Sequence, residues 1–159
     1  MLNEFGTTER GRAWLRLAEP LRVVRPNPHL VSARSLARSD RVELRRTVPG
    51  RIEATVADRR TVEVELTFPL WDDAELAAAR GGEFPGLVPD DGSVRARCGC
   101  GRSGDARCRH VLATLIELAR RVDESPELAP ALRGLEVSGA AADPTRIRIA
   151  DLDPSAFWT

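Results

Sequence analysis

The sequence predicts an α+β fold in which helices flank a small antiparallel β-meander. Three consecutive runs between residues 41 and 68 alternate apolar and polar side chains, and short turns separate them. This alternation is typical of strands with one buried and one solvated face. Apolar residues recur at helical spacing on both sides of these runs. A chain of 159 residues can bury one hydrophobic core, with room for a small appendage.

The first half of the chain carries two short helices and the meander. We expect a helix over residues 12–19, ended by Pro20, and a helical turn over residues 31–40. Pro49-Gly50 and the segment 58–60 then form the two turns of the meander. The apolar side chains expected on its buried face are Val42, Leu44, Ile52, Ala54, Val56, Val62, Val64, Leu66 and Phe68.

A helix with its own start and stop signals follows the third strand. Asp72 can cap its first turn, and Glu75, three residues later, can complete a capping box. Gly81-Gly82 ends it, and residues 81–92 are so rich in Gly, Pro and Asp that they predict a loop. We therefore place a boundary after residue 92.

The second half begins with a short strand over residues 94–97. Apolar residues at helical spacing then predict a helix over residues 111–122, and Ser125-Pro126-Glu127 starts another. The sequence thus divides into three parts: an α+β region (1–92), a compact region with two helices (93–135) and a C-terminal tail (136–159).

All three cysteines and one of the two histidines fall within 13 residues. They form the pairs Cys98-Gly99-Cys100 and Cys108-Arg109-His110, a ligand set that suits tetrahedral Zn²⁺. We expect Gly99 to permit the tight bend between the first two thiolates. Four protein ligands leave no position for water, so the sequence predicts a structural zinc site that supplies folding energy to residues 93–123. We expect Cys108→Ala to unfold this part and not the meander. The other histidine, His29, is interpreted as a surface residue.

Two other interpretations of the cysteines are open. Buried cysteine is often a small inert hydrophobe, although arginine and glycine surround these three. A Cys98–Cys100 disulfide would close a strained ring and leave Cys108 without a partner.

Three clustered cysteines argue against a secreted disulfide scaffold. With no apolar run near the ~20 residues of a membrane span and no signal peptide, we expect a cytoplasmic protein without a membrane partner.

The charge distribution is uneven although the formal net charge is zero. All 24 basic residues are arginine. Residues 10–60 hold 13 of them against five acidic residues, and residues 93–110 hold five against one. A zero total excludes a protein that coats nucleic acid by bulk charge, but it allows a basic face. Salt bridges to the acidic segment 61–92, or a solvated face, are the alternative explanations of the arginines.

Five arginines alternate with the predicted metal ligands. Because the metal would hold the neighbouring side chains inward, we expect the guanidinium groups to point outward, where their planar forks suit phosphate oxygens. These candidate nucleic-acid contacts are Arg95, Arg97, Arg102, Arg107 and Arg109.

The C-x-C…C-x-H order, followed directly by an apolar helix, resembles the SWIM zinc finger. Gly11-Arg12-Ala13-Trp14, residues 33–42 and residues 49–54 also resemble the N-terminal part of bacterial SWIM zinc-finger proteins, so the likeness covers about residues 5–135. The resemblance implies zinc-dependent DNA binding or protein–protein interaction. It also implies association with a Swi/Snf-type helicase or the transcription machinery, and it does not imply an enzyme.

Two functions therefore follow from the sequence. The first is a non-enzymatic accessory or adaptor protein that contacts the nucleic-acid (DNA) backbone through the zinc finger. The second is a protein–protein interaction module in which the zinc is purely structural. In this second function the two C-terminal helices and the tail around Phe157-Trp158 would present an apolar groove. No Ser-His-Asp set or phosphate-cradling glycine loop predicts catalysis.

Overall fold

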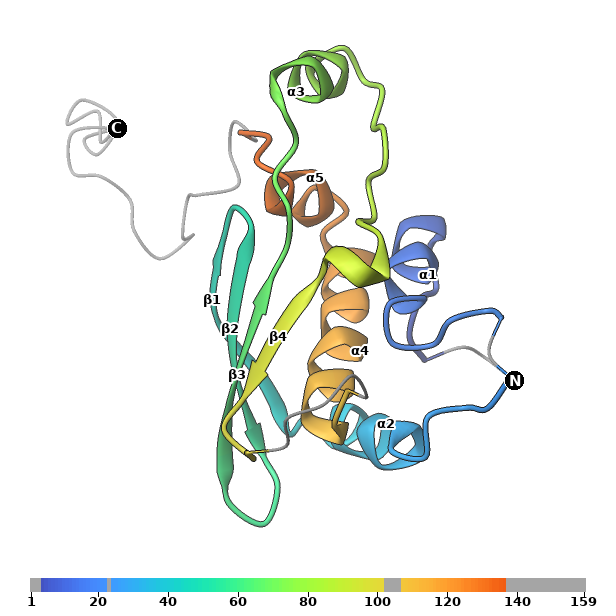
Figure 1. Ribbon diagram of the computed structural model, residues 1–159, viewed down its shortest axis with the longest axis vertical. Helices are drawn as coiled ribbons and strands as arrows, with labels where there is room; N and C mark the ends of the chain where they lie inside the picture. Colours follow the sequence, from blue (N-terminus) through green and yellow to red (C-terminus); the bar gives the residue numbers. More distant parts are fainter. Residues whose placement is uncertain (1–3, 23, 102–106, 137–159) are drawn as a thin grey trace, which may run out of the picture.

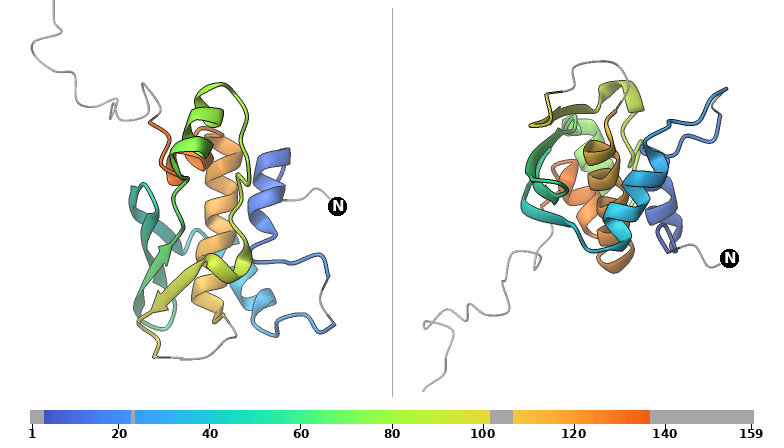
Figure 2. Two further views of the ribbon diagram at one scale, coloured as in Figure 1. Left: turned by 45° about the horizontal axis from the view of Figure 1, so that its top comes forward. Right: turned by 90° about the horizontal axis from the view of Figure 1, so that it is seen from below.

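The fold is known from a computed structural model, which describes residues 4–22, 24–101 and 107–136. Its elements form three layers, in which helix α4 lies between a β-sheet and the helix pair α1 and α2 (Figures 1 and 2). In chain order the elements are α1 (Glu9–Leu15), α2 (Leu30–Arg38), β1 (Val42–Val48), β2 (Arg51–Ala57), β3 (Thr61–Thr67), α3 (Asp73–Arg80), a 3-10 turn (Asp91–Ser93), β4 (Arg95–Cys98), α4 (Arg109–Glu124) and α5 (Leu128–Leu132). The predicted α+β class is confirmed.

The sheet has four antiparallel strands in the order β1-β2-β3-β4. The three-strand meander is confirmed, and its inward side chains meet in register, with Ile52 opposite Leu66 and Val56 opposite Val62. The predicted strand after the loop adds a fourth member, because β4 pairs with β3 from Thr67↔Arg95 to Val64↔Cys98. The chain reaches β4 through α3 and a linker that returns along the molecule (Figure 1). The sheet therefore leads directly into the cysteine motif.

Helix α4 forms the centre of the core. Every residue from His110 to Ala119 is buried, and so is Val122. One face of the helix packs on the sheet, and α1 and α2 cover the opposite side (Figure 2). The expectation that this helix presents an apolar groove is therefore wrong, because its apolar side chains are buried in the core. The predicted tail, residues 137–159 with Phe157-Trp158, lies outside the described residues.

The predicted boundary after residue 92 separates segments that share one core. A single cluster of buried side chains includes Trp14 of α1, Leu36 of α2, Leu66 of β3 and Leu115 of α4. The division into folding units remains a prediction, and the structure adds that the two parts bury each other's apolar surface.

Helix α1 begins three residues earlier than the sequence predicts. Thr8 caps it by accepting a hydrogen bond from Gly11 N at 3.0 Å. Asp123, near the end of α4, accepts hydrogen bonds from Thr7 N at 2.9 Å and Thr8 N at 2.8 Å. A Cβ atom on Gly11 would lie 1.8 Å from Asp123 Oδ1. Glycine is therefore required here because the Asp123 carboxylate occupies the space beside α1.

Asp123→Asn should destabilise the fold at neutral pH by about 1–3 kcal/mol, because it removes a charged acceptor from three donors. Burial by itself would raise the pKa of Asp123, but hydrogen bonds from Thr8 and Thr7 outweigh it and hold the pKa below its ordinary value. A lowered carboxyl pKa contributes stability above the unfolded pKa of ~3.9, and this stability is lost as the pH falls through the folded pKa.

Urea unfolding at pH 7 and pH 3 measures both effects. The wild type should lose more stability between these values than Asp123→Asn does. Glu124→Gln, on the neighbouring exposed residue, is the control and should keep the wild-type pH dependence. An Asp123→Asn variant with unchanged stability at pH 7 would show that the carboxylate is not needed.

The remaining elements match the sequence predictions with shifted ends. The capping box of α3 is present, with Asp72 Oδ1 accepting from Glu75 N at 2.8 Å and Glu75 Oε2 accepting from Asp72 N at 2.9 Å. The turn at Gly50 adopts a positive φ of 74°, and Gly50 N donates to Leu132 O of α5 at 2.8 Å. This hydrogen bond ties α5 to the turn between β1 and β2.

Candidate metal centre

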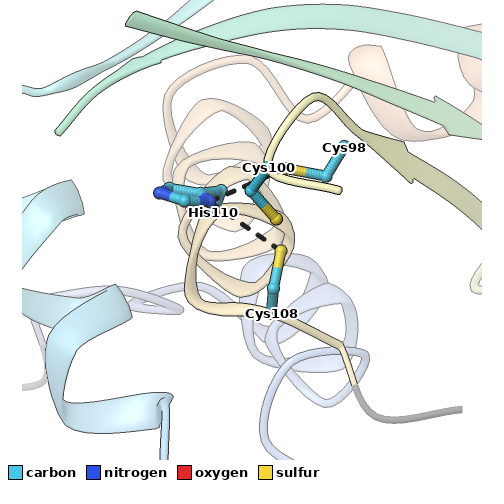
Figure 3. Close-up of side chains that lie close together, drawn as sticks. All are labelled: Cys98, Cys100, Cys108 and His110. Atoms are coloured by element: carbon cyan, nitrogen blue, oxygen red, sulfur yellow. Dashed lines mark hydrogen bonds between the residues drawn. The ribbon is translucent and has the colours of Figure 1, made fainter. Parts of the chain in front are cut away.

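The four predicted ligands converge at the junction of β4 and α4. Cys98 ends β4, Cys100 lies two residues later, Cys108 is the N-cap of α4, and His110 is in its first turn. Their ligand atoms all lie within 4.8 Å of one another (Figure 3). His110 Nδ1 is 3.6 Å from Cys98 Sγ and 3.9 Å from Cys108 Sγ. Ligand atoms of a tetrahedral Cys₃His zinc site stand roughly 3.5–3.8 Å apart, given Zn–S ~2.3 Å and Zn–N ~2.0 Å. The cluster is therefore compatible with a bound metal such as zinc.

The bend of the first ligand pair does not depend on Gly99 as predicted. Gly99 N donates to Glu63 O at 2.9 Å, so this residue still pairs with β3. A Cβ atom on Gly99 would come no closer than 3.6 Å to another residue, an ordinary contact. The positive φ, 72°, belongs to Gly101, whose N–H donates to Cys98 O at 3.4 Å. The chain reverses only after its pairing with β3 ends, which is why the left-handed conformation falls after Cys100.

The surroundings of Cys98 disfavour ionisation of its thiol. Cys108 and His110 are buried, whereas Cys98 and Cys100 are half-buried. Burial, the largest cause, raises the pKa of Cys98 to about 12, and the neighbouring Cys100 and Cys108 thiols add to the rise. A thiol in this setting is neutral unless a cation is present, and a divalent ion that binds here must displace the thiol protons.

A carboxylate that the sequence analysis missed orients the histidine ligand. Asp58, in the turn between β2 and β3, places Oδ2 2.9 Å from His110 Nε2 and 2.5 Å from Arg109 Nη2. The hydrogen bond from His110 is the main cause that lowers the pKa of Asp58. With Nε2 donating to this carboxylate, Nδ1 keeps its lone pair for a metal. Asp58 is 52 residues from His110, so no local pattern marks it.

Asp58→Ala should weaken zinc binding by roughly 10–100-fold, because a carboxylate that accepts a hydrogen bond from a metal-bound histidine fixes the tautomer and orientation of its ring. A competition titration against a chromophoric chelator measures the affinity. Glu83→Ala, an exposed carboxylate in the linker, is the control and should bind zinc as the wild type does. Equal affinities for Asp58→Ala and the wild type would rule out this orienting role.

One candidate nucleic-acid contact, Arg107, points into the protein. Its side chain is only 16% exposed and forms an ion pair with Asp91 Oδ1 at 2.6 Å. It also donates to Leu17 O, just beyond the end of α1. The expectation of an outward guanidinium is wrong here, because the arginine precedes a helix whose N-terminus is packed against α1 and the linker. Arg107 holds these segments together.

The other four candidate arginines occupy different positions. Arg95 and Arg97 are exposed on β4, and Arg97 lies opposite Glu65 of β3. Arg109 forms the ion pair with Asp58 described above. Arg102 lies outside the described residues. Their assignment to nucleic acid remains a prediction.

None of the described helices has the length and apolar character needed to cross a membrane. No family model matches this sequence, and comparisons with curated proteins and with solved structures also find no match. A function for this chain must therefore be inferred from the chemistry of the Cys₃His cluster and its surroundings.

Proposed function

We propose that the chain is a SWIM-type zinc protein that contacts the nucleic-acid backbone as a non-enzymatic accessory of a larger helicase or transcription complex. The observation that carries the proposal is the closed set of four ligand atoms within 4.8 Å at the β4–α4 junction. Three thiolates and one imidazole favour zinc over harder divalent ions. Because four side chains complete a tetrahedron, the ion has a structural role.

The order of the ligands along the fold supports the SWIM-type assignment. The C-x-C pair follows a β-strand, and the C-x-H pair opens a long buried helix. This is the arrangement expected from the sequence resemblance, in which an apolar helix directly follows the second pair.

The distribution of arginines supports a polyanion partner at the metal end of the sheet. Arg59 and Arg60, in the turn between β2 and β3, are exposed, and so are Arg95 and Arg97 of β4. In the same row of the sheet as Arg95, Arg51 is neutralised by ion pairs with Glu53 at 2.5 Å and Glu65 at 2.7 Å. Arg59, Arg60 and Arg97 therefore offer positive charge to phosphates near the zinc ligands.

Fluorescence polarisation with labelled duplex DNA over a salt series tests this function. Binding should weaken with salt, with a log–log slope near −3 for roughly three phosphate contacts. The double variant Arg95→Gln/Arg97→Gln should reduce both the affinity and the slope. Arg80→Gln, at the end of α3, is the control and should have little effect. Absence of binding at low salt, or affinity that does not change with salt, would exclude backbone recognition.

A second function, a protein-interaction module, is favoured by one apolar segment. Leu21, Val24 and Val31 expose 77%, 101% and 80% of their surface within the connection from α1 to α2 and the start of α2. Apolar side chains grouped on a surface often mark a contact with another protein. Serine at all three positions should abolish capture of a helicase partner but leave DNA binding intact. The opposite result would assign the partner contact elsewhere.

A further inference from the structure

We propose that a cleft beside the metal centre binds a phosphate group, and that this cleft is where the chain holds a nucleic-acid backbone. The second part rests on the function proposed above. The cleft has a volume of about 450 Å³ and is formed by four segments of the chain. These are the turn between β2 and β3 with the start of β3, Cys100 just after β4, the start of α4, and His29, which precedes α2. Neither the sequence motif nor the ligand spacing points to this cleft.

Three arginines line the cleft. Arg59 and Arg60 come from the β2–β3 turn, and Arg109 is the first residue of α4. Arg60 Nη2 donates to Gly99 O at 3.3 Å, which uses one of the five N–H donors of its guanidinium. Arginine forks present paired donors that match the oxygens of a phosphate. The donors suited to phosphate are thus held on fixed elements around one space.

The acidic residue that lines the cleft, Asp58, is already paired with neighbouring side chains. Asp58 accepts hydrogen bonds from His110 and Arg109, and these contacts lower its pKa. Its negative charge is therefore matched by Arg109. A zinc ion with three thiolates leaves one net negative charge, which the two positive charges of Arg59 and Arg60 exceed. The cleft consequently favours an anion.

The volume of the cleft indicates how large a phosphate-containing ligand it can hold. Small-molecule sites commonly enclose ~300–1,000 Å³, so about 450 Å³ accommodates a phosphate together with an attached sugar. In Figure 3 the edge of the His110 ring that carries Nε2 points away from the sulfur atoms. The metal ligands Cys100, Cys108 and His110 line one side of the cleft, and in the proposed site the arginines bind the phosphate.

Calorimetry on the zinc-loaded full chain tests the inference with three probes: inorganic phosphate, a thymidine trinucleotide with a 5′-phosphate, and thymidine without phosphate. The trinucleotide should bind and thymidine should not. Arg59→Gln/Arg60→Gln should weaken trinucleotide binding at least tenfold. The matched control is Arg22→Gln/Arg25→Gln, on two exposed arginines of the α1–α2 connection, and it should stay within twofold of the wild type. Zinc content must equal that of the wild type in both variants. If Arg60→Gln lowers the zinc content, the single variant Arg59→Gln is used in place of the double variant.

The possible outcomes test the phosphate-binding cleft and the proposed nucleic-acid function separately. Trinucleotide binding that is absent, or unchanged in the Arg59→Gln variants, would overturn the cleft, even if duplex DNA still binds in a salt-dependent way. Binding of the trinucleotide without any affinity for long DNA would support the cleft but contradict the nucleic-acid function. Binding of inorganic phosphate alone would support a phosphate site and exclude the polynucleotide as its source.

Discussion

Removal of the metal, by a chelator or by Cys108→Ala, should unfold the whole described core and not only the loop that carries the ligands. Cys108 is the N-cap of α4 and His110 lies in its first turn, so the ion fixes the start of the central helix. Structural zinc contributes an apparent ~10–16 kcal/mol, which matches or exceeds the ~5–15 kcal/mol stability of a typical domain. The sequence alone led us to expect unfolding of residues 93–123 with an intact meander. The structure changes this expectation, because the inner face of the sheet packs on α4.

Amide hydrogen exchange read by mass spectrometry distinguishes the two outcomes. After chelation, peptides from β2 and β3 should lose protection together with those from α4. Added Zn²⁺ should restore protection in the wild type, whereas Mg²⁺, which prefers oxygen ligands, should not. Protection that persisted in β2 and β3 while α4 exchanged would show that the meander folds independently.

Trp14→Ala should cost about 3–5 kcal/mol, the usual penalty for emptying a large buried aromatic site. Trp14 is fully buried in α1 and meets Phe68 edge-on, with ring centroids 5.5 Å apart. Helix α1 has only seven residues, far fewer than the ~12–15 that give an isolated helix marginal stability. Its docking therefore depends on this side chain.

Urea unfolding followed by far-UV circular dichroism gives the free-energy difference. Trp14→Phe is the informative control, because the indole N–H has no hydrogen-bond partner among the described residues. It should retain most of the stability, since it keeps an aromatic ring and removes a buried polar group without a partner. A loss below 1 kcal/mol for Trp14→Ala would mean that α1 contributes little to the core.

Local patterns in the sequence predicted the elements, and long-range contacts explain most of what they missed. The alternation in residues 41–68 and the capping box at Asp72 depend on neighbours in the chain, and both are confirmed. The pairing of β4 with β3 closes across a helix and a linker. The early start of α1 combines the local Thr8 cap with hydrogen bonds to Asp123, more than 100 residues away. The β4–β3 pairing and the contact with Asp123 leave no local signature.

In the candidate site, too, the sequence predicts residues with a local pattern and misses contacts between distant segments. The four ligands were predictable because cysteine and histidine at this spacing have few other uses. The sequence places Asp58 only in a turn, because its contact with His110 requires the β2–β3 hairpin to lie against the start of α4. The sequence predicts a solvent-facing Arg107, but Asp91 supplies a carboxylate and Leu17 a carbonyl oxygen for its guanidinium. Residue type predicted the ligands, and tertiary packing decides what surrounds them.

The most direct measurement is zinc K-edge X-ray absorption, combined with elemental analysis of purified, untagged protein. A Cys₃His centre requires one zinc per chain, with three sulfur atoms at ~2.3 Å and one nitrogen at ~2.0–2.1 Å. Cys98→Ser should remove one sulfur from this shell. A protein without zinc, or a zinc shell that contains only oxygen and nitrogen, would contradict the metal centre on which the proposed function depends.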